Sequence, residues 1–344
     1  MAYGSVLGRN TKPQFVPTFA ISGPFPGDTV TVSYGGTTVE AVEDNGVWYA
    51  KAWAYGNYTV NLISTTGNKN TTVNVDEVKL YEVMLTNVNT TLDNNSWDVI
   101  RKVADAGQAS NYWTVGDRKL VALNGTVGAL VLKNYTTYCF ILGFNHNAEL
   151  EGNNTIHFQF CKTALSGGTD LALVDEGWGN YYSESASARF VMNTTKTNSG
   201  GWKTCYMRNT ICNAFLNAFA TELRNVVIKC DKYTNNTGKK ISSENAVTVT
   251  EDYSFLLSEY EVYGRIEGSD SNEADKQIQY DYYSSGNSPI KYKDTEWTVR
   301  TSWWLRSPTM SLDTYFTVVF GDVSGIPSAT IADVSEGFAP AFCV

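Results

Sequence analysis

Short segments in which apolar and polar residues alternate recur between residues 17 and 85. The stretch DTVTVSY (28–34) alternates valine and tyrosine with threonine and serine, and Gly35 and Gly36 follow it as a hairpin signal. Further short alternating segments follow, separated by turns such as EDNG. Short strands at this spacing predict a β-sandwich over residues 17–85, with an extended arm at 1–16 before it.

The pattern changes after a polar, aperiodic segment at 86–95, which we interpret as a linker. Ser96 can cap a helix over the next ten residues, and an apolar stripe predicts a second helix over 208–225. The segment SEYEVYG (258–264) predicts one short helical turn. Strand-like segments fill much of the rest, so residues 96–344 are predicted to form one α+β domain.

Composition excludes several function classes. The 344 residues carry a net charge of −9 and show no cluster of lysine and arginine, so we expect neither a nucleic-acid partner nor an anionic membrane surface. No run of about 18 apolar residues occurs, which predicts no membrane insertion. The first 15 residues do not resemble a secretory signal, and the six cysteines form no C-x-x-C pair. We therefore expect buried free thiols and synthesis in a reducing cytoplasm.

The sequence offers little catalytic or metal-binding chemistry. His146 and His157 are the two histidines, without a third ligand at metal spacing, so we predict no metal site and no cofactor. There is no G-x-S-x-G motif and no phosphate-binding glycine loop, so we predict no catalytic residue. We interpret the carboxylates of 267–281 as a solvated acidic loop, and whether this loop binds Ca²⁺ stays open.

The stretch TSWWLRSP (301–308) contains two adjacent tryptophans. In a strand, Trp303 points to the opposite face from Trp304 and Arg306. One interpretation is that Trp304 and Arg306 form an exposed platform for a sugar. The alternative is that both rings belong to the core and that Arg306 pairs with a buried acid.

Two loops combine aromatic residues with serine, glycine and asparagine, a mixture that is typical of adaptable recognition surfaces. They are DEGWGNYYSES (175–185) and QYDYYSSGNSP (279–289). Ordinary surface loops are the alternative. The candidate ligand-binding residues from the loops and the tryptophan strand are Trp178, Tyr181, Tyr182, Tyr280, Tyr282, Tyr283, Trp304 and Arg306.

Five blocks of the second half carry a resemblance to a known family. They are SWDVIRKVADAGQASNYWTVGDRKLVAL (96–123), GGWKTCYMRNTICNAFL (200–216), FLLSEYEVYG (255–264), WWLRSP (303–308) and GFAPAFCV (337–344). Together they resemble a domain of unknown function from gut bacteria and their phages, whose hallmark is WWLRSP followed by a closing G-x-x-P-A. That domain is similar to the C-type-lectin-like fold of the sulfatase-modifying-factor variety. Residues 17–85 resemble immunoglobulin-like and carboxypeptidase-regulatory-like modules.

The resemblance implies a multi-domain β-rich protein, with an immunoglobulin-like β-sandwich before a C-type-lectin-like α+β domain. The sulfatase-modifying relatives use cysteines near the C-terminus, whereas Cys343 alone lies in the last hundred residues here, so we expect no enzyme. A binding composition without an export signal fits a phage virion protein, made in the host cytoplasm and displayed on the particle exterior.

The role that we expect is adhesion to a host-surface glycan or protein as part of a tail fibre or tail tip. The arm and the sandwich would bind other virion proteins, and we expect a homo-oligomer on the particle. The alternatives are a capsid decoration protein or head fibre with an outward-facing binding domain, and a glycan or cell-wall hydrolase.

Overall fold

Residues 16–163, 168–182, 189–322 and 324–344 are described by the computed structural model, and the chain divides into two units between Val88 and Asn89. This boundary falls inside the segment that was predicted as a linker, but residues 89–95 belong to the second unit. The predicted arm lies outside the described residues except for its last position. No helix in the described ranges has the length and apolar character needed to span a bilayer.

The first unit consists of two four-stranded sheets, with strand orders β4-β5-β1-β8 and β3-β2-β6-β7. Alternation places Val30 and Val32 in a shared core with apolar side chains of the other sheet, while their threonine neighbours face outward. Gly35 and Gly36 have φ of +60° and +81°, which suits a tight hairpin and confirms the predicted turn between β2 and β3. The strands are β1 (Thr18–Ser22), β2 (Thr29–Tyr34), β3 (Thr37–Glu40), β4 (Val42–Asp44), β5 (Val47–Lys51), β6 (Gly56–Ile63), β7 (Lys69–Val75) and β8 (Leu80–Met84).

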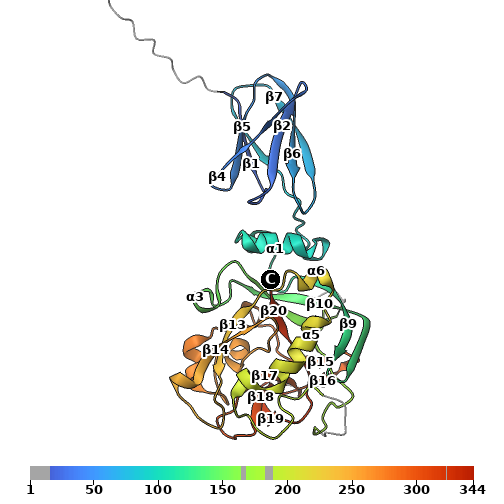
Figure 1. The fold of residues 1–344 in the computed structure, drawn as a ribbon, viewed down its shortest axis with the longest axis vertical. Coiled ribbons are helices and arrows are strands. Elements are labelled where there is room, and N and C mark those ends of the chain that lie inside the picture. The colour runs from blue at the N-terminus through green and yellow to red at the C-terminus, as the bar shows by residue number, and fades with distance from the viewer. Residues whose placement is uncertain (1–15, 164–167, 183–188, 323) are drawn as a thin grey trace, which may run out of the picture. The chain divides into compact units, whose positions relative to one another are not determined.

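The second unit is built on four small sheets rather than one large one (Figure 1). Their strand orders are β20-β11-β10-β9, β12-β15-β16, β13-β14 and β17-β18-β19. The strands are β9 (Arg118–Val127), β10 (Leu130–Phe144), β11 (Ile156–Lys162), β12 (Leu171–Ala172), β13 (Cys230–Asn235), β14 (Val247–Asp252), β15 (Lys291–Lys293), β16 (Glu296–Thr301), β17 (Trp303–Pro308), β18 (Tyr315–Val319), β19 (Pro327–Ile331) and β20 (Ala341–Cys343).

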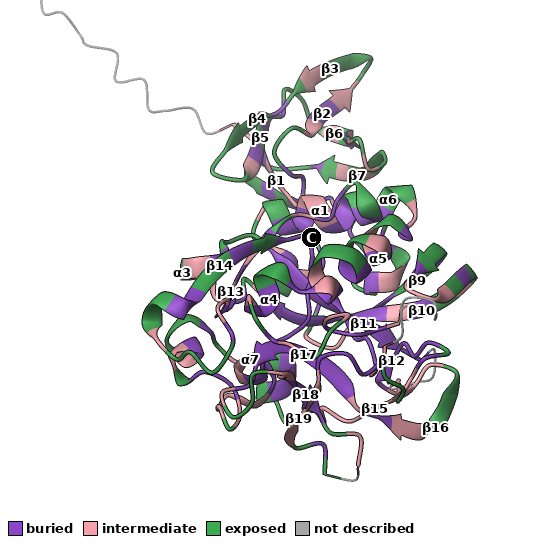
Figure 2. Cartoon of the chain, turned by 60° about the horizontal axis from the view of Figure 1, so that its bottom comes forward, coloured by how far each residue is buried: buried purple, intermediate pink, exposed green. Residues whose placement is uncertain are grey.

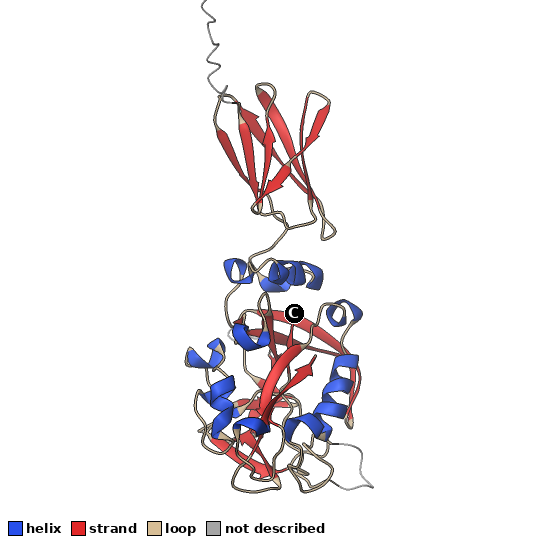
Figure 3. Cartoon of the chain, turned by 60° about the vertical axis from the view of Figure 1, so that its left-hand side comes forward, coloured by secondary structure: helices blue, strands red, loops and turns tan. Residues whose placement is uncertain are grey.

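Short helices and long loops surround these strands (Figure 3). The helices are α1 (Trp97–Asp105), α2 (Ala109–Tyr112), α3 (Ala148–Glu151), α4 (Gly201–Thr204), α5 (Asn213–Asn217), α6 (Thr221–Arg224), α7 (Glu259–Tyr263) and α8 (Asp281–Ser284). Shorter turns of 3₁₀ type are Leu92–Asn94, Glu244–Ala246 and Ser271–Lys276, and Met207–Cys212 is a π-helical turn. The Ser96 side chain caps α1 by accepting from the amide of Val99, as the sequence predicted.

The prediction of one continuous helix over 208–225 is wrong, because the helical segment is interrupted. The π-helical turn and α5 end at Asn217, and α6 begins again at Thr221. Between them the carbonyl of Ala218 accepts a hydrogen bond from the amide of Asn124 in β9, and Ala220 is extended. Tertiary contact with the sheet therefore replaces the helical hydrogen bonds that the apolar stripe alone would continue.

The C-terminal strand lies in the interior of the second unit. β20 pairs with β11, and the ring of Phe342 stacks on that of Phe158 with centroids 5.4 Å apart. Trp97 of α1 closes this cluster with its edge against Phe158. Strands β11 and β17 are buried throughout their length (Figure 2). All six cysteines are buried and unbridged, which confirms the prediction of free thiols.

Candidate functional site

Every residue of β17, the WWLRSP strand, is buried, so both of its faces point into the protein. Trp303 donates its indole N–H to the carbonyl of Pro289 at 2.9 Å, and Trp304 donates its own to the carbonyl of Phe190 at 2.7 Å. Both rings therefore anchor distant loops onto the strand. The interpretation of Trp304 and Arg306 as an exposed platform is wrong, because both side chains are 0% exposed.

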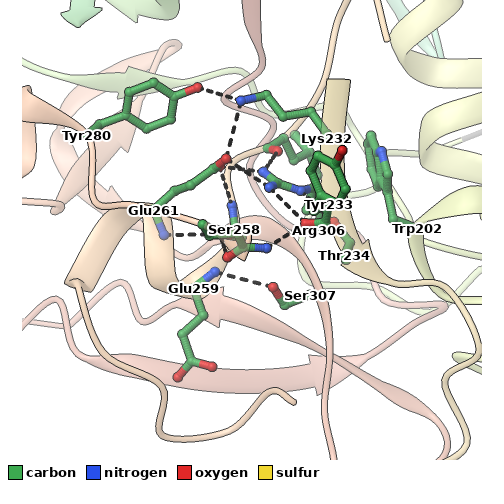
Figure 4. Close-up of polar contacts among 12 residues, drawn as sticks. Trp202, Lys232, Tyr233, Thr234, Ser258, Glu259, Glu261, Tyr280, Arg306 and Ser307 are labelled. Carbon is green, nitrogen blue, oxygen red and sulfur yellow. Dashed lines mark hydrogen bonds and ion pairs between the residues drawn. The ribbon is translucent and has the colours of Figure 1, made fainter. Parts of the chain in front are cut away.

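Arg306 is paired with the buried acid Glu261, as the alternative interpretation predicted (Figure 4). The two groups form a bidentate pair, in which Nη2 of Arg306 lies 2.8 Å from Oε1 of Glu261 and Nη1 contacts Oε2. The guanidinium also donates to the Thr234 hydroxyl at 2.7 Å and to the Leu256 carbonyl at 2.9 Å. Its charge is thus compensated by one acid and by the hydrogen bonds that it donates to two other segments.

The short helix α7 holds Glu261 in position. The Ser258 hydroxyl accepts from the amide of Glu261, and the Glu261 carboxylate accepts from the amide of Ser258, so the two residues form a capping box. Gly264 ends the helix with φ of +65°. The helical turn predicted from SEYEVYG is confirmed at both ends. The Glu261 carboxylate that completes the capping box is also the group that forms the ion pair with Arg306.

Lys232 extends this network on the other side of Glu261. Its ammonium lies 3.3 Å from Oε1 of Glu261 and 2.9 Å from the hydroxyl of Tyr280 (Figure 4). It also lies 2.6 Å from Oε2 of Glu151. Burial alone would raise the pKa of the Glu261 carboxyl, but the charges of Arg306 and Lys232 outweigh it and hold that pKa below its ordinary range. The network is fully buried, so it stabilises an interior and offers no surface to a ligand.

The tyrosines of the predicted loop 279–289 also point inward, which corrects their assignment as surface residues. Tyr280 is 0% exposed, and Tyr282 and Tyr283 are 5% exposed. The hydroxyl of Tyr283 donates to Oε1 of Gln159 at 2.6 Å, and that of Tyr282 accepts from Lys162 at 2.8 Å. The turn of α8 carries the rings beneath the surface, where each hydroxyl finds a buried partner.

The prediction of a solvated acidic loop over 267–281 holds for Glu267, Asp275 and Asp281, which are exposed, but not for the other two carboxylates. Glu273 is 0% exposed and accepts hydrogen bonds from the Asn235 amide and the Ser307 hydroxyl. Asp270 is also 0% exposed and is bonded to the side chains of Ser242 and Asn235. These carboxylates hold neighbouring loops together through donors of this chain.

The candidates of the first loop stay at or near the surface. Tyr181 is 55% exposed and lies under the ammonium of Lys196, and Tyr182 is half-buried. Trp178 is half-buried, and the ammonium of Lys293 lies 3.7 Å from its ring centroid. Residues 183–185 of this loop lie outside the described residues.

A surface cavity of about 330 Å³ is lined in part by Asp294 and Trp297, and we call it the Trp297 pocket. Its residues are Leu120, Tyr135, Thr136, Thr137, Tyr138, Lys162, Thr163, Leu171, Asp294 and Trp297. Trp297 is 53% exposed, and its indole N–H donates to the Asp294 carbonyl at 3.0 Å, which orients the ring. The Tyr135 hydroxyl donates to Oδ2 of Asp294 at 3.2 Å. The pocket thus joins exposed aromatic surface to a carboxylate and several hydroxyls.

Sequence reasoning missed this pocket because its residues come from separate strands. Leu120 lies in β9, Tyr135 in β10 and Trp297 in β16, and no short stretch contains the combination. The turn between β15 and β16 brings Asp294 and Trp297 together. An isolated tryptophan between charged neighbours, as in DTEWTVR (294–300), was the signal that the sequence contained.

Lys162, which lines this pocket, shares the carboxylate of Asp170 with a second buried lysine, Lys291. Lys162 lies 2.8 Å from Asp170, while the ammonium of Lys291 lies 3.7 Å from the same side chain. Burial lowers the pKa of Lys291, Asp170 opposes this and the charge of Lys162 adds to it, and together they bring the pKa to about 8. The folded protein therefore releases this proton at a lower pH than the unfolded chain does.

This arrangement predicts a pH dependence that belongs to Lys291. Between about pH 8 and 10.5 the unfolded chain binds the Lys291 proton more tightly, so the stability contribution of this group rises with pH. Relative to Lys291→Met, the wild type should gain about 1–2 kcal/mol in free energy of unfolding between pH 7 and 9.5. Urea unfolding of both proteins at each pH measures the difference, and parallel curves would contradict the assignment.

Comparison with known proteins finds one family model that matches part of the chain. Residues 181–344 match the model of a family described as Domain of unknown function (DUF6273). The match contains WWLRSP and GFAPAFCV, together with Lys232, Glu261 and Arg306, but it begins well after residue 96, where the resemblance in the sequence began. No curated protein and no solved structure matches the chain.

Proposed function

We propose that this chain is a non-enzymatic bacteriophage virion protein that attaches the particle to a glycan on the host-cell surface. In this proposal the first unit is an immunoglobulin-like module that binds other virion proteins, and the second is a C-type-lectin-like display domain. A tail fibre or tail tip is the location that we favour, and a capsid decoration protein is the alternative. The Trp297 pocket is the observation that carries the proposal.

The pocket has the chemistry that sugar recognition needs. A sugar ring presents an apolar C–H face and a rim of hydroxyls. The exposed ring of Trp297 can stack on the C–H face of the sugar. Asp294 and the hydroxyls of Thr136 and Tyr135 can form hydrogen bonds with the sugar hydroxyls. Glycoside hydrolysis usually needs two carboxyl groups at the scissile bond, and Asp294 is the one acid among the described residues of this pocket. This composition favours binding over cleavage.

The test uses the full chain on a printed array of bacterial surface polysaccharides and mucin glycans. Trp297→Ala is expected to lower binding about tenfold or more, because stacking aromatics are frequent hot spots. Its melting temperature should stay close to wild type, since the ring is 53% exposed. Trp53→Ala is the matched control, because Trp53 is a 41% exposed tryptophan of the first unit.

Three results would count against the proposal. They are a wild-type protein that binds no glycan on the array, a Trp297→Ala variant that binds as well as wild type, and release of reducing sugar from a bound polysaccharide. Gold-labelled antibody on phage particles separates the tail from the capsid, and particles without label would overturn the virion assignment.

A further inference from the structure

Three metal-ligating side chains meet beside the C-terminal strand, outside the Trp297 pocket. His157, Cys230 and Cys343 lie on β11, β13 and β20, and their ligand atoms are all within 4.8 Å of one another. His157 and Cys343 are direct partners in the pairing of β11 with β20. Nε2 of His157 lies 4.0 Å from Sγ of Cys230. All three side chains are buried, so the cluster is enclosed by protein.

The imidazole is oriented as metal-binding histidines usually are. Nδ1 of His157 lies 2.9 Å from the hydroxyl of Tyr280, which leaves Nε2 facing the sulfur of Cys230. Metal-ligating histidines commonly use their second nitrogen for a hydrogen bond of this kind, which fixes the tautomer and the ring plane. Lys232 contacts the same tyrosine hydroxyl at 2.9 Å and so fixes its position.

A fourth donor, Glu151, contacts one of the three, Cys230. Oε2 of Glu151 lies 3.6 Å from Sγ of Cys230, and its Oε1 is buried and has no hydrogen-bond partner among the described residues. A buried carboxylate oxygen without a partner is costly, because it has lost its water and gained nothing in return. A cation between Glu151 and the thiols would satisfy it.

We propose that His157, Cys230, Cys343 and Glu151 form a structural Zn²⁺ site that fastens the C-terminal strand to the core. One nitrogen, two sulfurs and one oxygen suit the tetrahedral preference of zinc, and the absence of an open position suits a structural ion. Zinc bonds of about 2.0–2.3 Å place tetrahedral ligand atoms about 3.3–3.8 Å apart, so a contraction of about 1 Å closes the site.

The charges balance when zinc binds. The ion takes the place of the two thiol protons, which leave to solvent, so two thiolates and one carboxylate surround a divalent cation. The remaining single negative charge is compensated by Lys232, whose ammonium lies 2.6 Å from Glu151. The site therefore needs no further counter-ion in the interior.

The sequence alone pointed away from this site, because its ligands are far apart in the chain and follow no metal-binding spacing. The pairing of β11 with β20 and the start of β13 bring the donors together. Cys343 supplies its ligand from β20. A metal bond there would add to the backbone hydrogen bonds that already join this three-residue strand to β11, Ile228 and Phe255.

The experiment measures metal in the full chain, expressed without an affinity tag that binds metals and purified without chelator. Elemental analysis is expected to give about one zinc ion per chain, and replacement by Co²⁺ should produce a thiolate-to-cobalt charge-transfer band. Cys230→Ser and Cys343→Ser should each lose the band and lower the zinc content about tenfold or more. Cys139→Ser is the matched control, because Cys139 is a buried thiol outside the cluster and should keep both signals.

If a serine variant does not fold, refolding of the wild-type protein with and without zinc still tests the proposal. Protein refolded from urea with Zn²⁺ should melt at a higher temperature than protein refolded with EDTA, because the ion binds the folded chain in preference. Folded wild type without zinc and without a cobalt band would overturn the proposal. So would zinc retained in Cys230→Ser, or a chain mass that shows a Cys230–Cys343 disulfide.

Discussion

Arg306→Met is expected to lower the free energy of unfolding of the second unit by about 3–5 kcal/mol. The substitution leaves the Glu261 carboxylate, which is 0% exposed, without its bidentate partner. It also removes the donors that satisfy the Thr234 hydroxyl and the Leu256 carbonyl. Lys232 remains near Glu261, but at 3.3 Å and shared with Glu151 it compensates only part of the charge.

Urea unfolding of the full chain, followed by tryptophan fluorescence, measures this loss. Arg265→Met is the matched control, since Arg265 pairs with Glu267 at the surface and its loss should cost less than about 1 kcal/mol. The double variant Arg306→Met with Glu261→Gln should be more stable than Arg306→Met alone, because no unpaired carboxylate remains. An Arg306→Met protein with wild-type stability would mean that the pair contributes nothing to the fold.

Local sequence patterns predicted the parts of this structure whose causes are local. The Ser258 and Glu261 capping box and the Gly264 terminus lie within seven residues, so the helical turn could be read directly from the chain. The glycine pair between β2 and β3 is a similar case, because positive φ is a property of the turn itself. Such features need no knowledge of distant partners.

The candidate site was predicted less well because exposure depends on partners that are distant in the sequence. Tyr280 and Tyr283 stand in a stretch whose composition is typical of a recognition loop. Their hydroxyls are nevertheless taken up by Lys232 and Gln159, which are 48 and 124 residues away. The same limit applies to Glu273, whose partners are an amide of β13 and a hydroxyl of β17. Composition alone does not show whether a polar aromatic residue closes a core or faces solvent.

The buried network of two acids, two cations and a tyrosine also has a structural role in the interior of the second unit. This unit has four small sheets and short helices, so long loops must be fixed to one another without a large continuous sheet. Charged side chains with several donors can reach three or four such segments at once, as Arg306 does. We infer that the WWLRSP strand holds these loops together in the interior. Ligand binding would then use residues of the outer surface.

Trp304→Ala tests this division between scaffold and surface. The ring is 0% exposed, and its removal is expected to lower the free energy of unfolding by about 3–5 kcal/mol through lost burial and an unfilled cavity. Trp304→Phe should lower the free energy of unfolding by less, because an aromatic ring is retained. The expected loss is about 1–3 kcal/mol, because the Phe190 carbonyl loses its hydrogen-bond donor. Thermal melting of the full chain gives this order, and glycan binding is measured on the fraction that stays folded.

The comparison with Trp297→Ala makes the result interpretable. If Trp304 is part of the scaffold, the folded fraction of Trp304→Ala keeps its glycan binding, whereas Trp297→Ala melts normally and loses it. A Trp304→Ala protein that melts like wild type but no longer binds would reverse the roles of the two tryptophans. Because Trp304 is buried and Trp297 is 53% exposed, a single pair of substitutions separates the loss of a fold from the loss of a contact.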